Sequence, residues 1–348
     1  MKKNHILLLL TIFSLLCWGD CYSQCSDQGN SLKIVFYNCE NFFDTDDDPR
    51  KNDNEFLPEN KKNWTLEKYN TKVSNISRVI YATDSINLPD IVGLCEIENQ
   101  NILEDLAGNP YLKKAGFQTI HFESSDDRGI DVALLYDPVK IKILYSRPVP
   151  VDDSGKKLRE ILYVKAIALN SDTINVFVNH WKSRSGGTSE TQPKRVLYAL
   201  ALKKVTDSLL AKNQHANIII MGDFNDEPGD VSVSASLGAL PPVEKPLSAA
   251  LYNLFYDFYK ARQGSYYYTG EKKWNMMDQI ILSGNFFSSQ KSKLHYVQGS
   301  AEIFRRNWML YKSPSGELLP SKTYSGTKYH GGFSDHLPVT IQLEKQKK

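Results

Sequence analysis

Short apolar runs alternate along the chain with amphipathic segments, and polar side chains follow several of these runs directly. Runs rich in Val and Ile lie at residues 132–136, 162–169, 174–178 and 218–221. Their length and composition predict strands. Because such strands alternate with helical patterns and no internal repeat or long linker interrupts them, the chain is predicted to be mixed α/β with substantial sheet.

Two segments place apolar residues at spacings of three and four, which predicts amphipathic helices. The first has Thr65 as its candidate N-cap and the apolar face Tyr69, Val73, Ile76 and Ile80. The second runs from about Arg195 to Leu210, with Leu197, Leu200, Ala201, Val205 and Leu209 on one face. The stretch 232–246 contains Gly238 and a Pro241-Pro242 pair and is typical of a loop insertion.

Carboxylate, imidazole and amide side chains recur at the ends of the predicted strands. The positions are Asn38 with Glu40, Glu96, His180, Asp223 with Asn225, Asp278, and Asp335 with His336. Asp278 precedes its strand, whereas most of the others follow theirs. Polar groups at strand ends are how a sheet assembles a site from distant parts of a sequence. Because these positions span Asn38 to His336, one catalytic domain is expected over residues 26–348.

The order of these motifs resembles a known superfamily. Asn38-x-Glu40, Glu96, Asn179-His180, Gly222-Asp223-Phe224-Asn225, Asp278 and Ser334-Asp335-His336 are similar to the motifs of the endonuclease/exonuclease/phosphatase superfamily. That group includes pancreatic-type deoxyribonucleases, apurinic endonucleases, sphingomyelinases and inositol polyphosphate 5-phosphatases. The resemblance covers roughly the whole mature chain. It implies a four-layer α/β sandwich of two packed mixed β-sheets flanked by helices, and Mg²⁺-dependent phosphoester cleavage with Mn²⁺ as the alternative metal.

A phosphodiester is anionic, so its hydrolysis needs charge neutralisation and an activated water. A hard cation held by oxygen ligands does the first, and the resemblance implies Glu96 as the principal ligand. Asn38 and Asp335 are expected to complete the shell, partly through water. Glu40 is a candidate for a second metal or for the rim of the site.

The remaining residues supply acid–base and hydrogen-bonding groups. His336 can accept a proton near neutral pH, and Asp278 is expected to fix its tautomer. His180 would donate to a phosphoryl or leaving oxygen, and Asn225 to the developing charge. Asp223 would orient the water or act as the base in place of His336; the sequence leaves both roles open.

Weaker candidates surround this set. Arg128, Lys182 and Arg184 are candidates for binding substrate phosphate. Trp274 and the Tyr266-Tyr267-Tyr268 run either stack on bases or pack a strand. A final set, Asp44, Asp46, Asp48 and Glu55, has the spacing of a calcium loop. Because Pro49 stands where that loop needs Gly, an acidic surface loop is the favoured interpretation.

The N-terminus has the pattern of a secretory signal. Lys2 and Lys3 precede an apolar run from Ile6 to Trp18, and cleavage is expected near Tyr22 to Cys25, so residues 1–25 are predicted to be a signal peptide. This favours secreted or periplasmic localisation. A lipid anchor is less well supported, because no small residue precedes Cys17, Cys21 or Cys25. No second long apolar run follows, so no membrane span is expected in the mature chain.

Composition adds two constraints. The net charge of +2 over 348 residues gives no whole-protein argument for nucleic acid and excludes no local basic groove. Cys39 and Cys95 each neighbour a candidate site residue and should point to the opposite strand face. Two buried thiols are therefore favoured over a disulfide, and no zinc spacing is present.

The function predicted from these residues is a secreted Mg²⁺-dependent phosphodiesterase, a nuclease of endonuclease type that uses metal and a His/Asp-activated water. A phosphatase or phospholipase-C-like hydrolase of inositol phosphates or sphingolipid head groups is the first alternative, because the chemistry residues are shared. A catalytically inactive binding protein is the second, although such a protein should have lost one or more of these residues. The expected partners are nucleic acid or another phosphoester, and the expected state is monomeric.

Overall fold

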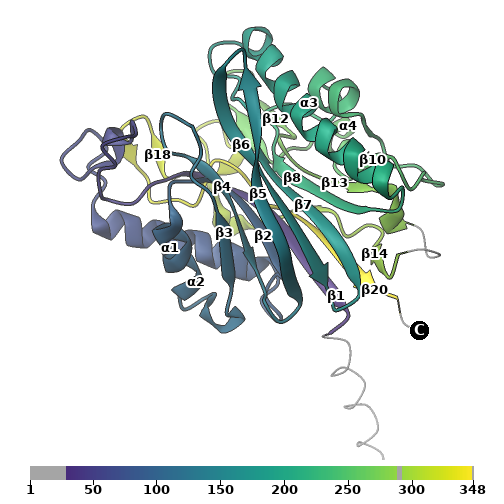
Figure 1. The fold of residues 1–348 in the computed structure, drawn as a ribbon. Coiled ribbons are helices and arrows are strands. Elements are labelled where there is room, and N and C mark those ends of the chain that lie inside the picture. Colours follow the sequence, from purple (N-terminus) through teal and green to yellow (C-terminus); the bar gives the residue numbers. More distant parts are fainter. Residues whose placement is uncertain (1–28, 288–291, 347–348) are drawn as a thin grey trace, which may run out of the picture.

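Two seven-stranded mixed sheets form the framework of this computed structural model, which describes residues 29–287 and 292–346. The predicted signal peptide at residues 1–25 lies outside the described residues. Figure 1 shows the two sheets side by side, with helices on their outer faces.

The first sheet has the strand order β14-β20-β1-β2-β4-β3, with β15 beside β20. Its strands are β1 (Ser31–Phe42), β2 (Ile91–Ile97), β3 (Gln118–His121), β4 (Asp131–Tyr136), β14 (Leu294–Tyr296), β15 (Glu302–Ile303) and β20 (Val339–Lys345). Strand β1 runs parallel to β2 and antiparallel to β20. The strand that carries Asn38 therefore lies between the strand that carries Glu96 and the strand that follows His336.

The second sheet has the order β5-β6-β7-β8-β13-β10-β9. Its strands are β5 (Ile141–Asp153), β6 (Lys156–Ala168), β7 (Asp172–His180), β8 (Asn217–Asp223), β9 (Ala239–Leu240), β10 (Leu251–Asn253) and β13 (Asp278–Ser283). The pairing places His180 opposite Asp223, and Asp223 opposite Asp278. Register alone thus brings three predicted site residues together at one end of this sheet.

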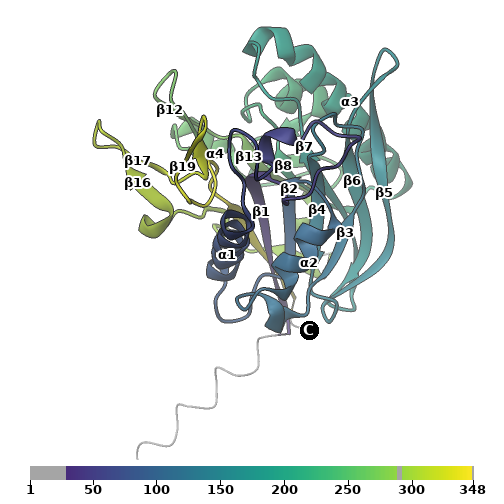
Figure 2. The same ribbon diagram turned by 90° about the vertical axis from the view of Figure 1, so that its left-hand side faces the viewer.

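Three apolar clusters separate the layers. The central one lies between the sheets and includes Phe36, Val176 and Ile341. A second packs the first sheet against α1 (Leu66–Thr83) and α2 (Gln100–Gly108), which Figure 2 shows along one face of that sheet. The third packs the second sheet against α3 (Thr188–Lys212). The predicted four-layer α/β sandwich is confirmed, since burial of apolar area on both faces of each sheet demands these layers.

Shorter elements complete the chain. They are α4 (Tyr256–Lys260), the hairpins β11 (Tyr266–Tyr268) with β12 (Lys273–Asn275), β16 (Leu310–Lys312) with β17 (Leu318–Pro320), and β18 (Tyr324–Ser325) with β19 (Lys328–Tyr329). None of the helices within the described ranges combines the length and hydrophobicity needed to cross a lipid bilayer.

Two local predictions need correction. Helix α3 begins at Thr188, ahead of the predicted start near Arg195, and it buries Tyr198, Leu202 and Thr206 while Leu200 is 49% exposed. The buried face of α3 also includes Arg195, which a pattern of apolar residues could not reveal. The stretch expected as a loop insertion contains a π-helical segment, Ser232–Leu237. By contrast, α1 starts directly after Thr65 as predicted, although the Thr65 side chain makes no capping hydrogen bond.

The two described cysteines are buried free thiols, as expected. Cys95 lies in the core between the sheets, whereas Cys39 lies in the core under α1 and α2. Because they point to opposite faces of the first sheet, they cannot form a disulfide with each other.

Candidate active site

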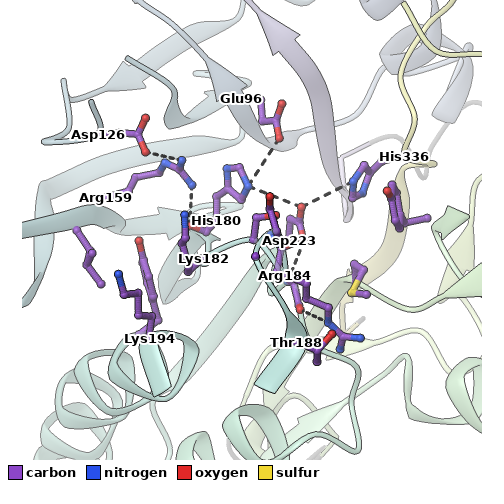
Figure 3. A pocket seen from close by; sticks show the side chains of 18 of the residues that line it. Glu96, Asp126, Arg159, His180, Lys182, Arg184, Thr188, Lys194, Asp223 and His336 are labelled. Carbon is purple, nitrogen blue, oxygen red and sulfur yellow. Dashed lines mark hydrogen bonds and ion pairs between the residues drawn. The ribbon is translucent and has the colours of Figure 1, made fainter. Parts of the chain in front are cut away.

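The ends of the strands from both sheets border an open cleft with a volume of about 1040 Å³. Most of the predicted site residues line it: Glu96, Arg128, His180, Lys182, Arg184, Asp223, Asn225, Asp335 and His336. Asn38, Glu40 and Asp278 are buried behind this lining. Figure 3 shows His180 and His336 on either side of Asp223, with Glu96 above them.

The backbone at these strand ends is unusual. Glu40, Asn41, Glu96 and Asn225 have positive φ angles between 45° and 59°, a region that non-glycine residues seldom occupy. The pairing of β2 with both neighbours is irregular at this end, and such irregularities re-aim side chains beside active sites. The backbone is therefore strained locally where Glu96 and Asn225 turn into the cleft.

Asp223 is at the centre of the site. Its Oδ2 accepts a hydrogen bond from Asn38 Nδ2 at 3.0 Å and lies 3.8 Å from the Nε2 atoms of both His180 and His336. Its Oδ1 accepts from the backbone N–H of Asn225 at 2.9 Å. Burial raises the pKa of Asp223 to about 6.

Packing in this region depends on Gly222. A Cβ at this position would stand 2.5 Å from the backbone oxygen of Asn179 on β7. The glycine before Asp223 is thus required by the close approach of the neighbouring strand.

His336 is oriented by a buried carboxylate, as predicted. Its Nδ1 donates to Asp278 Oδ2 at 2.6 Å, so Nε2 faces Asp223. Burial opposes the charged form, but Asp278 and Asp223 outweigh it and raise the pKa of His336 well above its usual value. The ring also packs against Tyr266, with a centroid separation of 4.8 Å.

His180 has a contrasting environment. Burial, together with the nearby charges of Arg159 and Arg128, holds the pKa of His180 well below its usual value. Its Nδ1 is buried without a hydrogen-bond partner among the described residues. An N–H buried without an acceptor is costly, which favours the tautomer with the proton on Nε2, the atom that faces Asp223 and Glu96.

Arg159 was missed by the sequence analysis. It is 7% exposed and donates to the carbonyl of His180 at 3.0 Å, to the carbonyl of Ile130 at 2.8 Å and to Asp126. It shares its strand face with Ile161 and Tyr163, which are buried under α3. The period-two pattern of β6 could have indicated a buried cation there.

Glu96 and Asp335 are two carboxylates of the same cleft. Glu96 Oε2 accepts from the backbone N–H of Asn41 at 2.6 Å, and its Oε1 lies 3.3 Å from Asn38 Nδ2. Burial raises the pKa of Asp335, and the charge of Glu96 adds to that rise although His336 opposes it. Carboxylate oxygens such as these are the donors that a hard divalent cation such as Mg²⁺ or Mn²⁺ prefers, and His180 Nε2 lies 3.8 Å from Glu96 Oε1 beside them.

Asn38 and Glu40 occupy other positions than the predicted metal shell. The amide oxygen of Asn38 accepts from the backbone N–H of Glu40 at 2.9 Å, so its N–H group faces Asp223 and Glu96. The Glu40 carboxylate accepts from Thr323 N at 2.7 Å and lies 3.8 Å from Lys72 Nζ. Asn38 thus orients two carboxylates, and Glu40 ties β1 to the C-terminal segment.

The candidate phosphate-binding cations differ from one another. Arg184 is held in the wall by Asp226 at 3.1 Å and Asp230 at 2.6 Å. Arg128 is exposed and makes a long 3.4 Å contact with Asn41. Lys182 is exposed at the cleft surface, where burial of part of its side chain and then the charges of Lys194 and Arg159 lower its pKa.

The tyrosine run divides between the cleft and the packing of the strand. Tyr266 and Tyr268 line the cleft. Tyr267 packs against Trp274 with a ring-centroid separation of 5.4 Å, as a strand-packing residue would.

The two-sheet fold and its carboxylate- and imidazole-rich cleft define the class of this protein. The sequence matches the Endonuclease/Exonuclease/phosphatase family over residues 33–345, so the chain belongs to that family. Its members are phosphoester hydrolases that generally use a divalent metal ion, and the prediction of a phosphoester hydrolase is confirmed at that level. A search of curated proteins finds no match.

Solved structures share the fold at low sequence identity. The humanized TDP2 of D. rerio is 16% identical with a TM-score of 0.54, covering 90% of this chain and 99% of its own. The mannosyl-6-phosphatase Bt3783 of Bacteroides thetaiotaomicron is 16% identical with a TM-score of 0.55, covering 90% and 99%. The human Nocturnin catalytic domain, with bound sulfate, is 14% identical with a TM-score of 0.50, covering 91% and 95%.

Proposed function

We propose that this chain is a metal-dependent phosphodiesterase that cleaves nucleic acid, as a nuclease of endonuclease type. Its predicted signal peptide would direct it out of the cytoplasm. The single observation that carries the substrate class is an arm of the cleft bordered by cations, which extends away from His180.

This cationic arm consists of Lys156, Lys182 and Lys194, with Arg128 at its edge, and all four line the same cleft as Asp223 and His336. Figure 3 shows Lys182 and Lys194 on the side of His180 away from His336. Among the described residues, Lys156 and Lys194 have only distant acidic partners, at 4.0 and 3.7 Å. A second phosphate on a polymer would satisfy these charges, whereas a lone phosphomonoester would fill only the site around Asp223.

The residues around Asp223 supply the chemistry of hydrolysis. A divalent metal held by Glu96 and Asp335 would neutralise the charge of the phosphate. His180 donates its Nε2 proton to a phosphoryl oxygen, and the Asn225 amide adds a second donor. Asp223 takes the proton of the attacking water as the water oxygen bonds to phosphorus. His336, which its raised pKa keeps protonated, gives a proton to the leaving oxygen as the bond from that oxygen to phosphorus breaks.

A panel of substrates tests this proposal. We expect the chain from residue 26 onward to nick plasmid DNA or cut RNA with Mg²⁺, and to lose this activity with chelator and in Glu96→Gln. Turnover of mannose 6-phosphate, an inositol phosphate or sphingomyelin without nucleic acid cleavage would instead establish the phosphatase or phospholipase-C-like alternative. Absence of turnover of every substrate, with or without metal, would support an inactive binding protein.

The cationic arm gives a second prediction. The Lys182→Ala/Lys194→Ala variant should raise KM for DNA and reduce the slope of log KM against log salt by about one per lysine. Its kcat on a nitrophenyl phosphodiester, which carries a single phosphate, should be unchanged. The matched control is Lys203→Ala, because Lys203 lies on α3 together with Lys194 and pairs with Asp207 at 2.9 Å. An unchanged salt slope in the double variant would count against a nucleic acid partner in this arm.

A further inference from the structure

A buried thiol lies behind the residues of the cleft and takes no part in the proposed hydrolysis. Cys95 is fully buried on β2, one residue before Glu96, and its side chain enters the core between the sheets. Its Sγ, a ring nitrogen of His180 and a carboxylate oxygen of Asp223 lie within 4.8 Å of one another. Because His180 and Asp223 line the cleft, this group of thiol, imidazole and carboxylate can be reached from the cleft.

The imidazole of His180 has no hydrogen-bond partner within the described parts of the chain. The residue is 4% exposed, and its Nδ1 is buried and unpartnered. Its Nε2 has carboxylate oxygens of Glu96 and Asp223 near it, but both are 3.8 Å away, which is too long for a hydrogen bond. Figure 3 shows this nitrogen turned towards both carboxylates. A buried polar ring without partners is costly, so His180 is available to a ligand that enters the cleft.

The other two side chains also have lone pairs to offer. Asp223 Oδ2 accepts one hydrogen bond, from Asn38 at 3.0 Å, and a carboxylate oxygen has two lone pairs. The Cys95 thiol makes no hydrogen bond among the described residues, whereas the Cys39 thiol donates to the carbonyl of Tyr37 at 3.8 Å. Each of the three side chains can therefore bind a metal ion without losing a protein contact.

The donor set and its spacing favour zinc. A tetrahedral zinc ion, with bonds of about 2.0–2.3 Å, holds its ligand atoms about 3.3–3.7 Å apart. The separation of 3.8 Å between His180 Nε2 and Asp223 Oδ2 is close to that spacing. A soft thiolate selects zinc over Mg²⁺, which takes oxygen ligands. No spacing in the sequence could show this site, because its ligands come from β2, β7 and β8.

We propose that Cys95, His180 and Asp223 bind Zn²⁺ and that the bound ion inhibits hydrolysis. Water from the cleft fills the fourth position of the tetrahedron. Zinc on these residues prevents His180 from donating to a phosphoryl oxygen and Asp223 from taking the proton of the attacking water. The inhibition rests on the proposed function, whereas the binding of zinc does not.

Zinc binding releases one proton. Burial, and then the charge of Asp223, raise the pKa of the Cys95 thiol well above its usual value, so the thiol is protonated in the zinc-free protein. Its proton leaves to solvent as the bond between sulfur and zinc forms. The single proton of the neutral His180 ring stays on the nitrogen that does not bind the ion.

Zinc titration of the chain from residue 26 onward, in which Cys39 and Cys95 are the only cysteines, tests the inhibition. We expect micromolar Zn²⁺ to abolish hydrolysis of a nitrophenyl phosphodiester at saturating Mg²⁺. Cys95→Ala should keep its kcat without zinc and need about a hundredfold more zinc for half inhibition, since even an indirect partner of a metal site contributes about ten- to a hundredfold in affinity. The matched control is Cys39→Ala, because Cys39 is equally buried but lies in the core under α1 and α2. It should be inhibited as the parent is.

Cobalt binding tests the site without reference to activity. Co²⁺ takes the same ligands as zinc, and a thiolate ligand gives it an intense charge-transfer absorption in the near ultraviolet. Ions held only by oxygen or nitrogen elsewhere on the protein do not produce it. We expect this absorption in the parent and in Cys39→Ala, and its loss in Cys95→Ala. Cys95→Ser, which keeps the size of the side chain, is the second variant, and circular dichroism shows which variants are folded.

Absence of the charge-transfer absorption in the parent with excess Co²⁺ would overturn the proposal, as would its persistence in a folded Cys95 variant. Equal zinc inhibition of the parent and of a folded Cys95 variant would mean that zinc acts by replacing the metal held at Glu96. If the parent hydrolyses none of the phosphoesters tested, the proposed function fails, and the cobalt absorption still decides whether the zinc site exists.

Discussion

Replacing His336 with alanine should lower kcat for phosphodiester hydrolysis by about a thousandfold, within the range of a positioned acid–base group. The reason is geometric: Asp278 fixes the ring at 2.6 Å and directs Nε2 towards Asp223 at 3.8 Å. The effect should fall on kcat, whereas the lysine variants of the cationic arm act on KM. Steady-state kinetics on a nitrophenyl phosphodiester at saturating Mg²⁺ measure it.

The control for this prediction is His330→Ala, because His330 is exposed and does not line the cleft. It should retain full activity. Far-ultraviolet circular dichroism of both variants would show whether the fold is intact. A folded His336→Ala protein with more than about a tenth of wild-type kcat would remove His336 from the chemistry.

The largest loss of stability should come from Asp226→Ala. Asp226 is 1% exposed and forms an ion pair at 2.7 Å with Arg195, a fully buried residue of α3. It also accepts from Ser232 Oγ at 2.6 Å and pairs with Arg184. Removing one partner of a buried ion pair leaves an uncompensated charge, so the free energy of unfolding should fall by about 3–5 kcal/mol. Urea denaturation measures this change.

The matched substitution is Asp207→Ala, on α3, the helix that carries Arg195. Asp207 pairs with Lys203 at 2.9 Å, but both side chains are about half exposed, so the loss should be roughly 0.5 kcal/mol or less. Similar losses in the two variants would mean that the buried pair contributes no more than a surface pair does.

The sequence predicted the strand-end clusters because their positions depend on local pattern. A run such as 218–221 must be a buried strand, so Asp223 must lie at its end. The pairing of His180, Asp223 and Asp278 then follows from adjacent strands. The direction in which Asn38 and Glu40 point was not predictable, because it depends on the left-handed turn at Glu40 and on backbone groups near Thr323.

The acidic segment after β1 shows the same limit more clearly. Local spacing selected Asp44, Asp46, Asp48 and Glu55, whereas the structure places Asp44 beside Glu98, whose carboxylate accepts from the backbone N–H of Asp44 at 2.7 Å. Glu98 arrives from another strand, and only the parallel pairing of β1 with β2 makes it a neighbour. The buried ion pair of Arg195 could not be predicted for a related reason. Arg195 lies in α3, before β8, whereas its partner Asp226 follows β8 in the sequence.

The pairing of β1 with β20 also determines when the first sheet can be completed during synthesis. The second sheet runs from β5 to β13 within a continuous middle portion of the chain, and it can form once that portion has left the ribosome. Strand β1 is made early, yet its neighbour β20 follows every other described strand of both sheets. Until then the edge of β1 stays unpaired and open to association with other chains. A chain that stops before residue 339 therefore lacks its closing strand and is expected to aggregate.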